Sequence, residues 1–157
     1  MRNLILLFLM VAFSANAEVD LVTVKKSINK MYLLEKGKVK KEYDIALGAN
    51  PRGHKEQEGD EKTPEGRYIL DYVKEDSSFY RSMHVSYPNK RDLENAKNKG
   101  VSAGGFIMVH GQKNNLGWLS LISQNFNWTD GCIALKNSEM DEFLEIVKVG
   151  TPIEISW

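Results

Sequence analysis

The chain contains one cysteine, Cys132, in the stretch Thr129-Asp130-Gly131-Cys132. A deprotonated cysteine sulfur is a strong nucleophile that forms covalent acyl intermediates. Gly131 permits a sharp turn and a close approach of a ligand, and Thr129 and Asp130 are polar residues that favour turns. The backbone N–H groups of such a turn can converge on one point, which is what an oxyanion requires. The pattern predicts thiol chemistry, whereas a small buried hydrophobic residue is the other interpretation of a lone cysteine.

A cysteine thiol, with an ordinary pKa of about 8.5, needs a base or a cation beside it to react near neutral pH. The chain has three histidines, at positions 54, 84 and 110. His54 lies in a charged stretch and His84 alternates with apolar residues, whereas His110 ends the apolar run 106–110 and precedes Gly111. A histidine at the end of a core strand is held rigidly while its ring reaches a cleft. We therefore predict His110 as the general base, and we expect the thiol pKa to lie below its ordinary value.

The start of the chain indicates export. Arg2 is followed by the unbroken apolar run 4–13 and then by Ala15-Asn16-Ala17, which matches a cleavage signature. We expect residues 1–17 to be a secretory signal peptide and residues 18–157 to form one domain, secreted across the inner membrane into the periplasm. The apolar run is shorter than the ~20 residues that span a bilayer, so we expect no stable membrane insertion. Structural cysteines in an oxidising compartment usually occur in pairs, so a solitary one is a candidate working thiol.

Composition excludes several classes of partner. The chain has 21 Lys and Arg residues against 21 Asp and Glu residues, a formal net charge of zero. Such a balance argues against a nucleic-acid surface or a basic membrane-binding tail. The histidines and the cysteine have neither C-x-x-C nor H-E-x-x-H spacing, so we expect no metal site.

The elements that would position this chemistry are mostly strands. Alternating and apolar runs predict strands at 21–26, 30–36, 39–47, 67–73, 106–110, 132–135 and 151–157. A short helix is expected at 92–100, ending at Gly100, and the segment 74–105 is otherwise mixed. The clearest helix is 137–150, with an apolar face, a cap at Asn137 or Ser138 and an end at Gly150. The expected fold class is mostly β, a β-rich α+β domain with a helix after the cysteine.

Val109-His110-Gly111 and the later TDGCIAL together resemble the signature of the L,D-transpeptidase catalytic domain family, the YkuD-like domain. That signature is His-Gly, followed later by Ser or Thr, a variable residue and Gly-Cys. Further segments are similar to the short periplasmic YafK-like branch of the family: TVKKSINKMYLLEKG, GHKEQEGDEKTPEGRY, SYPNKRDLENAK, GGFIMVHG and NSEMDEFLEIVKVGTPIEI. These segments occur in order and cover nearly the whole expected mature chain.

The resemblance implies the mostly β fold of that family and a site without metal or organic cofactor. It implies Cys132 as the nucleophile, His110 as the general base and N–H groups around Gly131 and Cys132 as oxyanion donors, with Thr129 and Gly111 in support. The implied partner is the stem peptide of peptidoglycan, with a wall-attached protein as a further candidate. The thiolate would attack the carbonyl after the L-centre of a diamino acid and expel D-alanine, leaving a thioester. An amine would convert the thioester into a 3–3 cross-link or an attached protein, and water would trim the peptide.

Three alternatives stay open. The branch includes enzymes that trim stem peptides or detach wall-linked proteins, so an L,D-carboxypeptidase or peptidoglycan hydrolase is an alternative to a transpeptidase. A non-catalytic wall-binding module with the same fold is an alternative from another class. A secreted toxin that acts on the wall of another cell is the third.

One position departs from the family pattern. Much of the family carries Arg two residues after the cysteine, and this chain has Ala134 there. The sequence does not choose which cation replaces that charge among Lys55, Arg81, Lys113 and Lys136. Further candidates for substrate binding are Tyr87, Asn89 and Asp130, although a core tyrosine and a turn asparagine explain the first two equally well. The segments 48–66 and 87–105 are the long stretches that could form the walls of a cleft.

Overall fold

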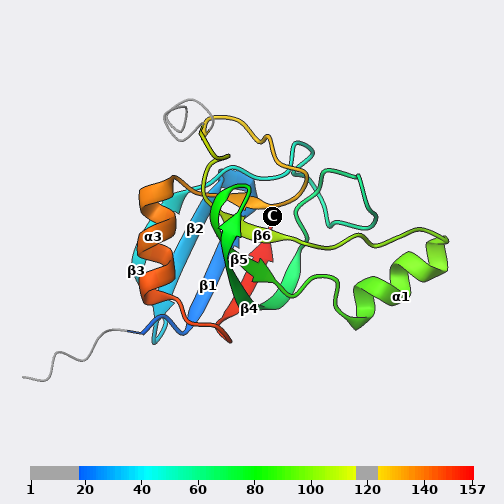
Figure 1. The fold of residues 1–157 in the computed structure, drawn as a ribbon. Helices are drawn as coiled ribbons and strands as arrows, with labels where there is room; N and C mark the ends of the chain where they lie inside the picture. Colours follow the sequence, from blue (N-terminus) through cyan, green and yellow to red (C-terminus); the bar gives the residue numbers. More distant parts are fainter. Residues whose placement is uncertain (1–17, 116–123) are drawn as a thin grey trace, which may run out of the picture.

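The computed structural model describes residues 18–115 and 124–157. The expected signal peptide, residues 1–17, lies outside the described residues and stays a prediction. No helix within the described residues is long and apolar enough to cross a membrane. The expectation of a mostly β fold is confirmed: the strands of the described chain form one sheet in the order β3-β2-β1-β8-β4-β5-β6-β7 (Figure 1).

The strands are β1 (Leu21–Lys25), β2 (Lys30–Glu35), β3 (Lys38–Asp44), β4 (Gly66–Ser77), β5 (Tyr80–Val85), β6 (Met108–His110), β7 (Ile133–Ala134) and β8 (Pro152–Ser156). The short 3-10 helix η1 (Lys26–Ile28) links β1 to β2, and the described α-helices are α1 (Lys90–Lys99) and α3 (Asn137–Ile146). β1 pairs with β8 and β6 pairs with β7 in parallel, while the other neighbouring strands are antiparallel.

β4 joins the two halves of the sheet. Its first residues pair with β8, and the rest of this 12-residue strand pairs with β5. The sequence predicted only residues 67–73 as a strand here and left β5 unassigned within the mixed segment 74–105. The reason is that the outer part of the β4–β5 hairpin is polar and largely exposed. Its strand conformation follows from cross-strand hydrogen bonds rather than from a hydrophobic pattern.

The core lies between the sheet and α3. Val22 on β1 pairs with Ile153 on β8, and both side chains are fully buried. The apolar face predicted for the helix after the cysteine is confirmed, since Met140 and Phe143 of α3 are also fully buried. Figure 1 shows α3 lying across one face of the sheet, while α1 lies on the opposite side of the molecule.

The ends predicted for α3 are wrong. The helix ends at Ile146 rather than at Gly150, because Val147 already adopts an extended conformation and turns inward to become buried. Lys136, not Asn137 or Ser138, stands at the cap position, and the Glu139 carboxylate accepts its backbone N–H at 3.1 Å. Asn137 does not cap the helix because its Oδ1 accepts the N–H of Gln112 at 2.8 Å. The Asn137 side chain, which the local pattern predicts as the helix cap, is therefore engaged in a tertiary hydrogen bond instead.

Other predicted boundaries also shift. α1 ends at Lys99 with Gly100 as its C-terminal cap, and it begins two residues earlier than predicted because Asn89 and Asp92 form a capping box. The strands predicted at 106–110 and 132–135 shorten to β6 and β7, and the one predicted at 39–47 ends with β3 at Asp44. The chain after β3 instead crosses to β7, where Ala46 and Ala134 form an isolated antiparallel bridge.

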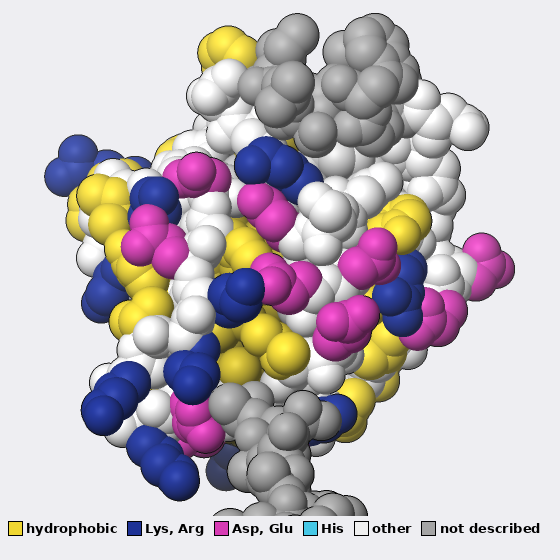
Figure 2. All heavy atoms as spheres, turned by 90° about the vertical axis from the view of Figure 1, so that its left-hand side faces the viewer, with side chains coloured by type: hydrophobic (Ala, Val, Ile, Leu, Met, Phe, Trp, Pro, Cys, Tyr) yellow, Lys and Arg dark blue, Asp and Glu magenta, His cyan; other side chains and the backbone are white. Residues whose placement is uncertain are grey.

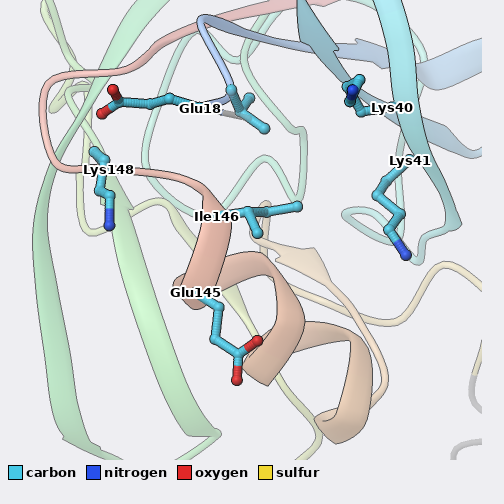
Figure 3. A pocket seen from close by; sticks show the side chains of 7 residues that line it. Glu18, Lys40, Lys41, Glu145, Ile146 and Lys148 are labelled. Atoms are coloured by element: carbon cyan, nitrogen blue, oxygen red, sulfur yellow. The ribbon is translucent and has the colours of Figure 1, made fainter. Parts of the chain in front are cut away.

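The face that carries α3 presents charged side chains of both signs with apolar side chains between them (Figure 2). A hollow of about 590 Å³ opens where the start of the described chain, β3 and the end of α3 meet. Figure 3 shows Ile146 between Glu18 and Lys148 on one side and Lys40 and Lys41 on the other. Its lining includes neither Cys132 nor His110.

Candidate active site

The pairing of β6 with β7 places the cysteine and the histidine on one face of the sheet. Val109 pairs with Ile133 and His110 with Ala134, and Cys132 directly precedes β7. Side chains alternate along extended chain, so Cys132 lies on the same face as Ala134 and therefore as His110. Contacts with the start of β6 hold the sulfur: Met108 N–H donates to Sγ at 3.4 Å, and the thiol donates to the Phe106 carbonyl at 3.6 Å.

The imidazole of His110 is fixed in one tautomer. Its Nδ1 lies 2.6 Å from the carbonyl oxygen of Gly111, and because a carbonyl only accepts, Nδ1 must carry the proton. Nε2 is then the unprotonated nitrogen and can accept a proton. The ring is 3% exposed and packs against Phe79 and Trp128, with centroid distances of 4.7 and 5.9 Å. Burial lowers the pKa of His110 to about 4, although the Gly111 bond opposes this shift, so the ring is neutral at neutral pH.

The turn that follows His110 requires a glycine. A Cβ on Gly111 would lie 2.7 Å from Asn137 Oδ1 and 2.9 Å from Tyr80 Cβ, closer than packed atoms approach. Gln112 closes the turn, since its side-chain amide donates to the Leu135 carbonyl at 2.7 Å. The close packing of Gly111 and the hydrogen bond of Gln112 therefore hold the Gly111 carbonyl, which orients the imidazole.

The turn before Cys132 is closed by the Thr129 hydroxyl. This hydroxyl accepts the Gly131 N–H at 3.2 Å and donates to the Cys132 carbonyl at 2.7 Å. Gly131 has a φ of +122°, and a Cβ there would lie 2.6 Å from the Lys62 carbonyl oxygen. The expectation that the N–H groups of Gly131 and Cys132 both face an oxyanion thus needs correction, because Thr129 already binds the first. The Cys132 amide remains as the candidate donor.

The electrostatic surroundings do not favour a preformed thiolate. Burial raises the pKa of the Cys132 thiol, the Met108 N–H opposes that shift, and the Asp130 and Lys55 charges act in opposite directions. The expectation of a thiol pKa below its ordinary value is therefore wrong for the free protein. With His110 neutral as well, the site holds a neutral thiol beside a neutral imidazole.

A hollow of about 530 Å³ opens at Phe106, and neither Cys132 nor His110 is among the residues that line it. It is lined by Lys55, Glu58, Gly59, Ser102, Gly104, Gly105, Phe106 and Asp130. Its two walls come from the segments 48–66 and 87–105, as the sequence predicted, and they are joined where Glu58 N–H donates to the Ser102 carbonyl at 2.8 Å. The hollow reaches the thiol through Phe106, whose carbonyl accepts the S–H.

The comparison with known protein families agrees with this geometry. Residues 19–155 match the L,D-transpeptidase catalytic domain family, YkuD. The chain belongs to this family.

Several relatives of the L,D-transpeptidase domain are similar to the chain in sequence or structure. The protein provisionally named L,D-transpeptidase YafK, from Escherichia coli strain K12, is 27% identical over 107 residues, which are 67% of this chain and 36% of YafK. The helical cell shape determining protein Pgp2 of Campylobacter jejuni is 27% identical with a TM-score of 0.66, covering 92% of this chain and 52% of that structure. The Enterococcus faecium L,D-transpeptidase, at 18% identity and a TM-score of 0.56 over 88% of this chain and 50% of its own, shows the fold alone. The chain thus spans between about a third and half of the length of these relatives.

The three candidate substrate-binding residues lie in different places in this L,D-transpeptidase domain. Asp130 is exposed and lines the hollow. Tyr87 is 2% exposed, and its hydroxyl donates to the Ala103 carbonyl at 3.0 Å, so it supports a wall from within. Burial also raises the pKa of Tyr87 above its ordinary range. Asn89 accepts the Asp92 N–H at 3.1 Å as the cap of α1 and is not among the residues that line the hollow.

The other two histidines are bound to carboxylates. His54 accepts the Glu65 N–H on Nδ1 at 2.9 Å and places Nε2 3.2 Å from the buried Asp92. His84 lies 2.7 Å from Asp71 on the β4–β5 hairpin. Within residues 18–115 and 124–157, no group of three or more His, Cys, Asp and Glu side chains could hold a metal ion.

Phe106 is a site residue that sequence reasoning missed. The sequence places it in a buried strand, yet its side chain is 82% exposed, beside the hollow, and its φ is +54°. A bulky residue in the left-handed region is a strained conformation, and here it turns the Phe106 carbonyl toward the thiol. The two glycines before it were the available signal, since they allow the chain to bend away from a strand.

Proposed function

We propose that this chain is a cysteine-dependent acyl transferase that acts on stem peptides of peptidoglycan. The observation that carries the proposal is the placement of Cys132 and the fixed imidazole of His110 on one face of β6 and β7, beside a hollow. Membership of the L,D-transpeptidase catalytic domain family supports the substrate class.

In the acylation step, a substrate carbonyl enters beside the sulfur of Cys132. Nε2 of His110 takes the thiol proton as the sulfur attacks, so a thiolate need not exist beforehand. The Gly111 carbonyl stabilises the imidazolium that forms, and the Cys132 amide donates to the developing oxyanion. His110 then returns the proton to the leaving amine, D-alanine departs, and a thioester remains on Cys132.

The second step decides the product. An amine acceptor attacks the thioester and loses its proton to His110, the C–S bond breaks, and the Cys132 sulfur leaves and takes that proton back. The amide that forms gives a 3–3 cross-link or an attached protein. If water attacks instead, the product is a trimmed tripeptide, and the enzyme is an L,D-carboxypeptidase. Transfer needs a site that positions an amine and excludes water. We place transfer first because of the family, with hydrolysis through the same thioester as the alternative.

The biological setting is also a proposal. With residues 1–17 removed as a signal peptide, the domain would act in the periplasm on the wall. The likeness to Pgp2, which is described as a helical cell shape determining protein, leads us to include cell shape among the consequences. The wall-attached protein considered from the sequence would be an alternative acceptor or substrate.

Intact-mass analysis with a tetrapeptide-stem muropeptide tests this function. We expect an adduct on Cys132 with release of D-alanine, followed by amide or tripeptide product when an amine or only water is supplied. Cys132→Ser is the control and should form no thioester. If the folded protein gives neither adduct nor product with any stem peptide, the enzymatic proposal is wrong and a non-catalytic wall-binding module takes its place.

A further inference from the structure

The tip of the β4–β5 hairpin lies against the imidazole of His110. Phe79, in the turn between the two strands, packs its ring on the imidazole with a centroid distance of 4.7 Å and an interplanar angle of 42°. Trp128 packs against both rings, at 6.0 Å from Phe79 and 5.9 Å from His110. Phe79 is partly buried and lies outside the hydrophobic core of the described residues, so its packing is directed to the site.

The hairpin tip is tied to α3 by one carboxylate. The Tyr80 hydroxyl donates to Asp141 Oδ2 and the Arg81 guanidinium donates to Asp141 Oδ1, both at 2.9 Å. Arg81 also donates to Glu75 across the hairpin at 2.8 Å, which joins the two strands near the turn. The residues that follow Phe79 are therefore fixed to a helix of the core.

A second anchor comes from the segment that follows His110. The side chain of Asn114 accepts the Tyr80 N–H at 2.8 Å and donates to the Ser77 carbonyl at 2.9 Å, and its backbone N–H donates to the Ser78 carbonyl at 3.1 Å. Tyr80 has a φ of +63°, a conformation that a bulky residue keeps only where surrounding contacts impose it. The turn that carries the aromatic ring is thus held from two directions.

Burial dominates the protonation of the covered imidazole. Besides Tyr80 and Arg81, which are bound to Asp141, the titratable groups on the hairpin tip and on the segments beside the ring are Glu75, Asp76, Lys113, Asp130 and Cys132. None of these described groups contributes to the lowered pKa of His110, which burial causes and the Gly111 bond opposes. Apolar cover is therefore the means by which this site keeps its histidine neutral.

We propose that Phe79 is a positioning residue for the acyl transfer, whose ring covers one side of the imidazole of His110, keeps water from it and holds it beside Trp128. The inference rests on the proposed function, in which His110 is the base. A base must be unprotonated to accept a proton, and a cover that excludes water disfavours the charged imidazolium. The hairpin thereby keeps the base ready at a pH at which an exposed histidine is charged.

Titration of the histidine ring signals by NMR tests the cover without any substrate. The midpoint of His110 is expected at about 4 in the unmodified protein and should rise by about one pH unit or more in Phe79→Ala. Phe79→Leu keeps an apolar cover and should stay close to the unmodified protein. Tyr72→Ala is the matched control, because Tyr72 stacks on His84 at 4.5 Å in the same hairpin. An unchanged His110 midpoint in Phe79→Ala would overturn the inference.

The pH profile of the reaction links the cover to catalysis. The acid limb of kcat/KM for D-alanine release from a tetrapeptide stem reports protonation of the base in the free enzyme. In Phe79→Ala this limb should move to higher pH together with the NMR midpoint, and Phe79→Leu should restore it. A loss of kcat/KM by the same factor at every pH would show a merely structural role and overturn the inference. Release by no variant, the unmodified protein included, would contradict the proposed function itself.

A variant outside the site decides the matter if Phe79→Ala does not fold. Asp141→Ala removes the carboxylate that binds Tyr80 and Arg81, and this residue is on the exposed side of α3. A loosened hairpin tip admits water to the imidazole, so the NMR midpoint of His110 should rise by about half a pH unit. The same midpoint as in the unmodified protein would overturn the inference.

Discussion

At the scale of single residues, the site depends on the orientation of one imidazole. The Gly111 carbonyl fixes the proton of His110 on Nδ1, so Nε2 is ready to accept the proton of Cys132 without a change of tautomer. Burial keeps both groups neutral in the free protein. In the proposed mechanism, proton transfer therefore accompanies attack on the substrate instead of preceding it.

Replacing either residue of this pair should abolish the reaction. We expect Cys132→Ser and His110→Ala each to lower kcat by about a thousandfold or more, because the nucleophile and its base act as a unit. The double variant should be no worse than the single ones, as measured by D-alanine release. His84→Ala, in which the histidine bound to Asp71 is removed, is the matched control and should retain activity. Loss of activity in the control but not in His110→Ala would mean that another histidine is the base.

The thiol itself should react slowly until high pH. Because burial raises the pKa of Cys132, the rate of alkylation by iodoacetamide should rise with a midpoint above the ordinary value of about 8.5. A rate measurement across pH on the unmodified protein checks this, with a model cysteine peptide as the reference. A midpoint below that of the peptide would instead indicate a preformed thiolate and imidazolium pair.

At the scale of elements, the loop 48–66 is held in place by a buried lysine that is not part of the site. Lys26 in η1 is 1% exposed and donates to the carbonyls of Gly53 and Thr63, both at 2.7 Å, and to Glu65 at 3.0 Å. Burial lowers the pKa of this ammonium, and the bonds to Glu65 oppose the shift. Gly53, Thr63 and Glu65 of the loop therefore bind one ammonium group, that of Lys26, and this fixes one wall of the hollow.

Removing that anchor should loosen the wall. Lys26→Ala leaves three acceptors without their donor, so we expect a loss of about 2–4 kcal/mol in the free energy of unfolding and faster proteolysis within the loop. Urea unfolding and limited proteolysis measure these effects. The neighbouring Lys25→Ala is the control, because Lys25 is exposed and its ammonium reaches Ser156 Oγ at the surface. Similar small changes in both variants would show that the anchor contributes little.

At the scale of the whole molecule, the buried imidazole couples the site to folding stability. The pKa of His110 is about 4 in the folded protein and about 6.5 in an unfolded chain, so the unfolded state binds more protons between these values. The contribution of this group is fully present above pH 6.5 and is lost as the pH falls toward 4. The shift corresponds to about 3 kcal/mol.

A variant without the titrating ring isolates that contribution. Between pH 7 and pH 4.5 the unmodified protein should lose more unfolding free energy than His110→Gln, and the difference should be about 2–3 kcal/mol. Urea unfolding at both pH values measures this, and carboxylates that titrate in the same range cancel in the comparison. Equal losses would mean that the imidazole is accessible to protons in the folded state.

The sequence by itself determined the family, the candidate residues and much of the architecture. Cys132 and His110 are found from residue type, neighbouring glycines and strand patterns, and the strands of the core and the apolar face of α3 follow from periodicity. These features depend on residues only a few positions apart. The two long segments that wall the hollow also follow, because they are the long stretches that connect predicted strands.

The tertiary structure alone decided how these parts act together. The raised thiol pKa, the use of the Gly131 amide by Thr129 and the exposure of Phe106 arise where distant segments meet. So does the burial of Lys55, since it depends on how the loop folds over Asp60. Burial and hydrogen bonding between residues far apart in the chain leave no local pattern in the sequence. That is why the candidate residues of this site could be named from the sequence, while the direction of their pKa shifts could not.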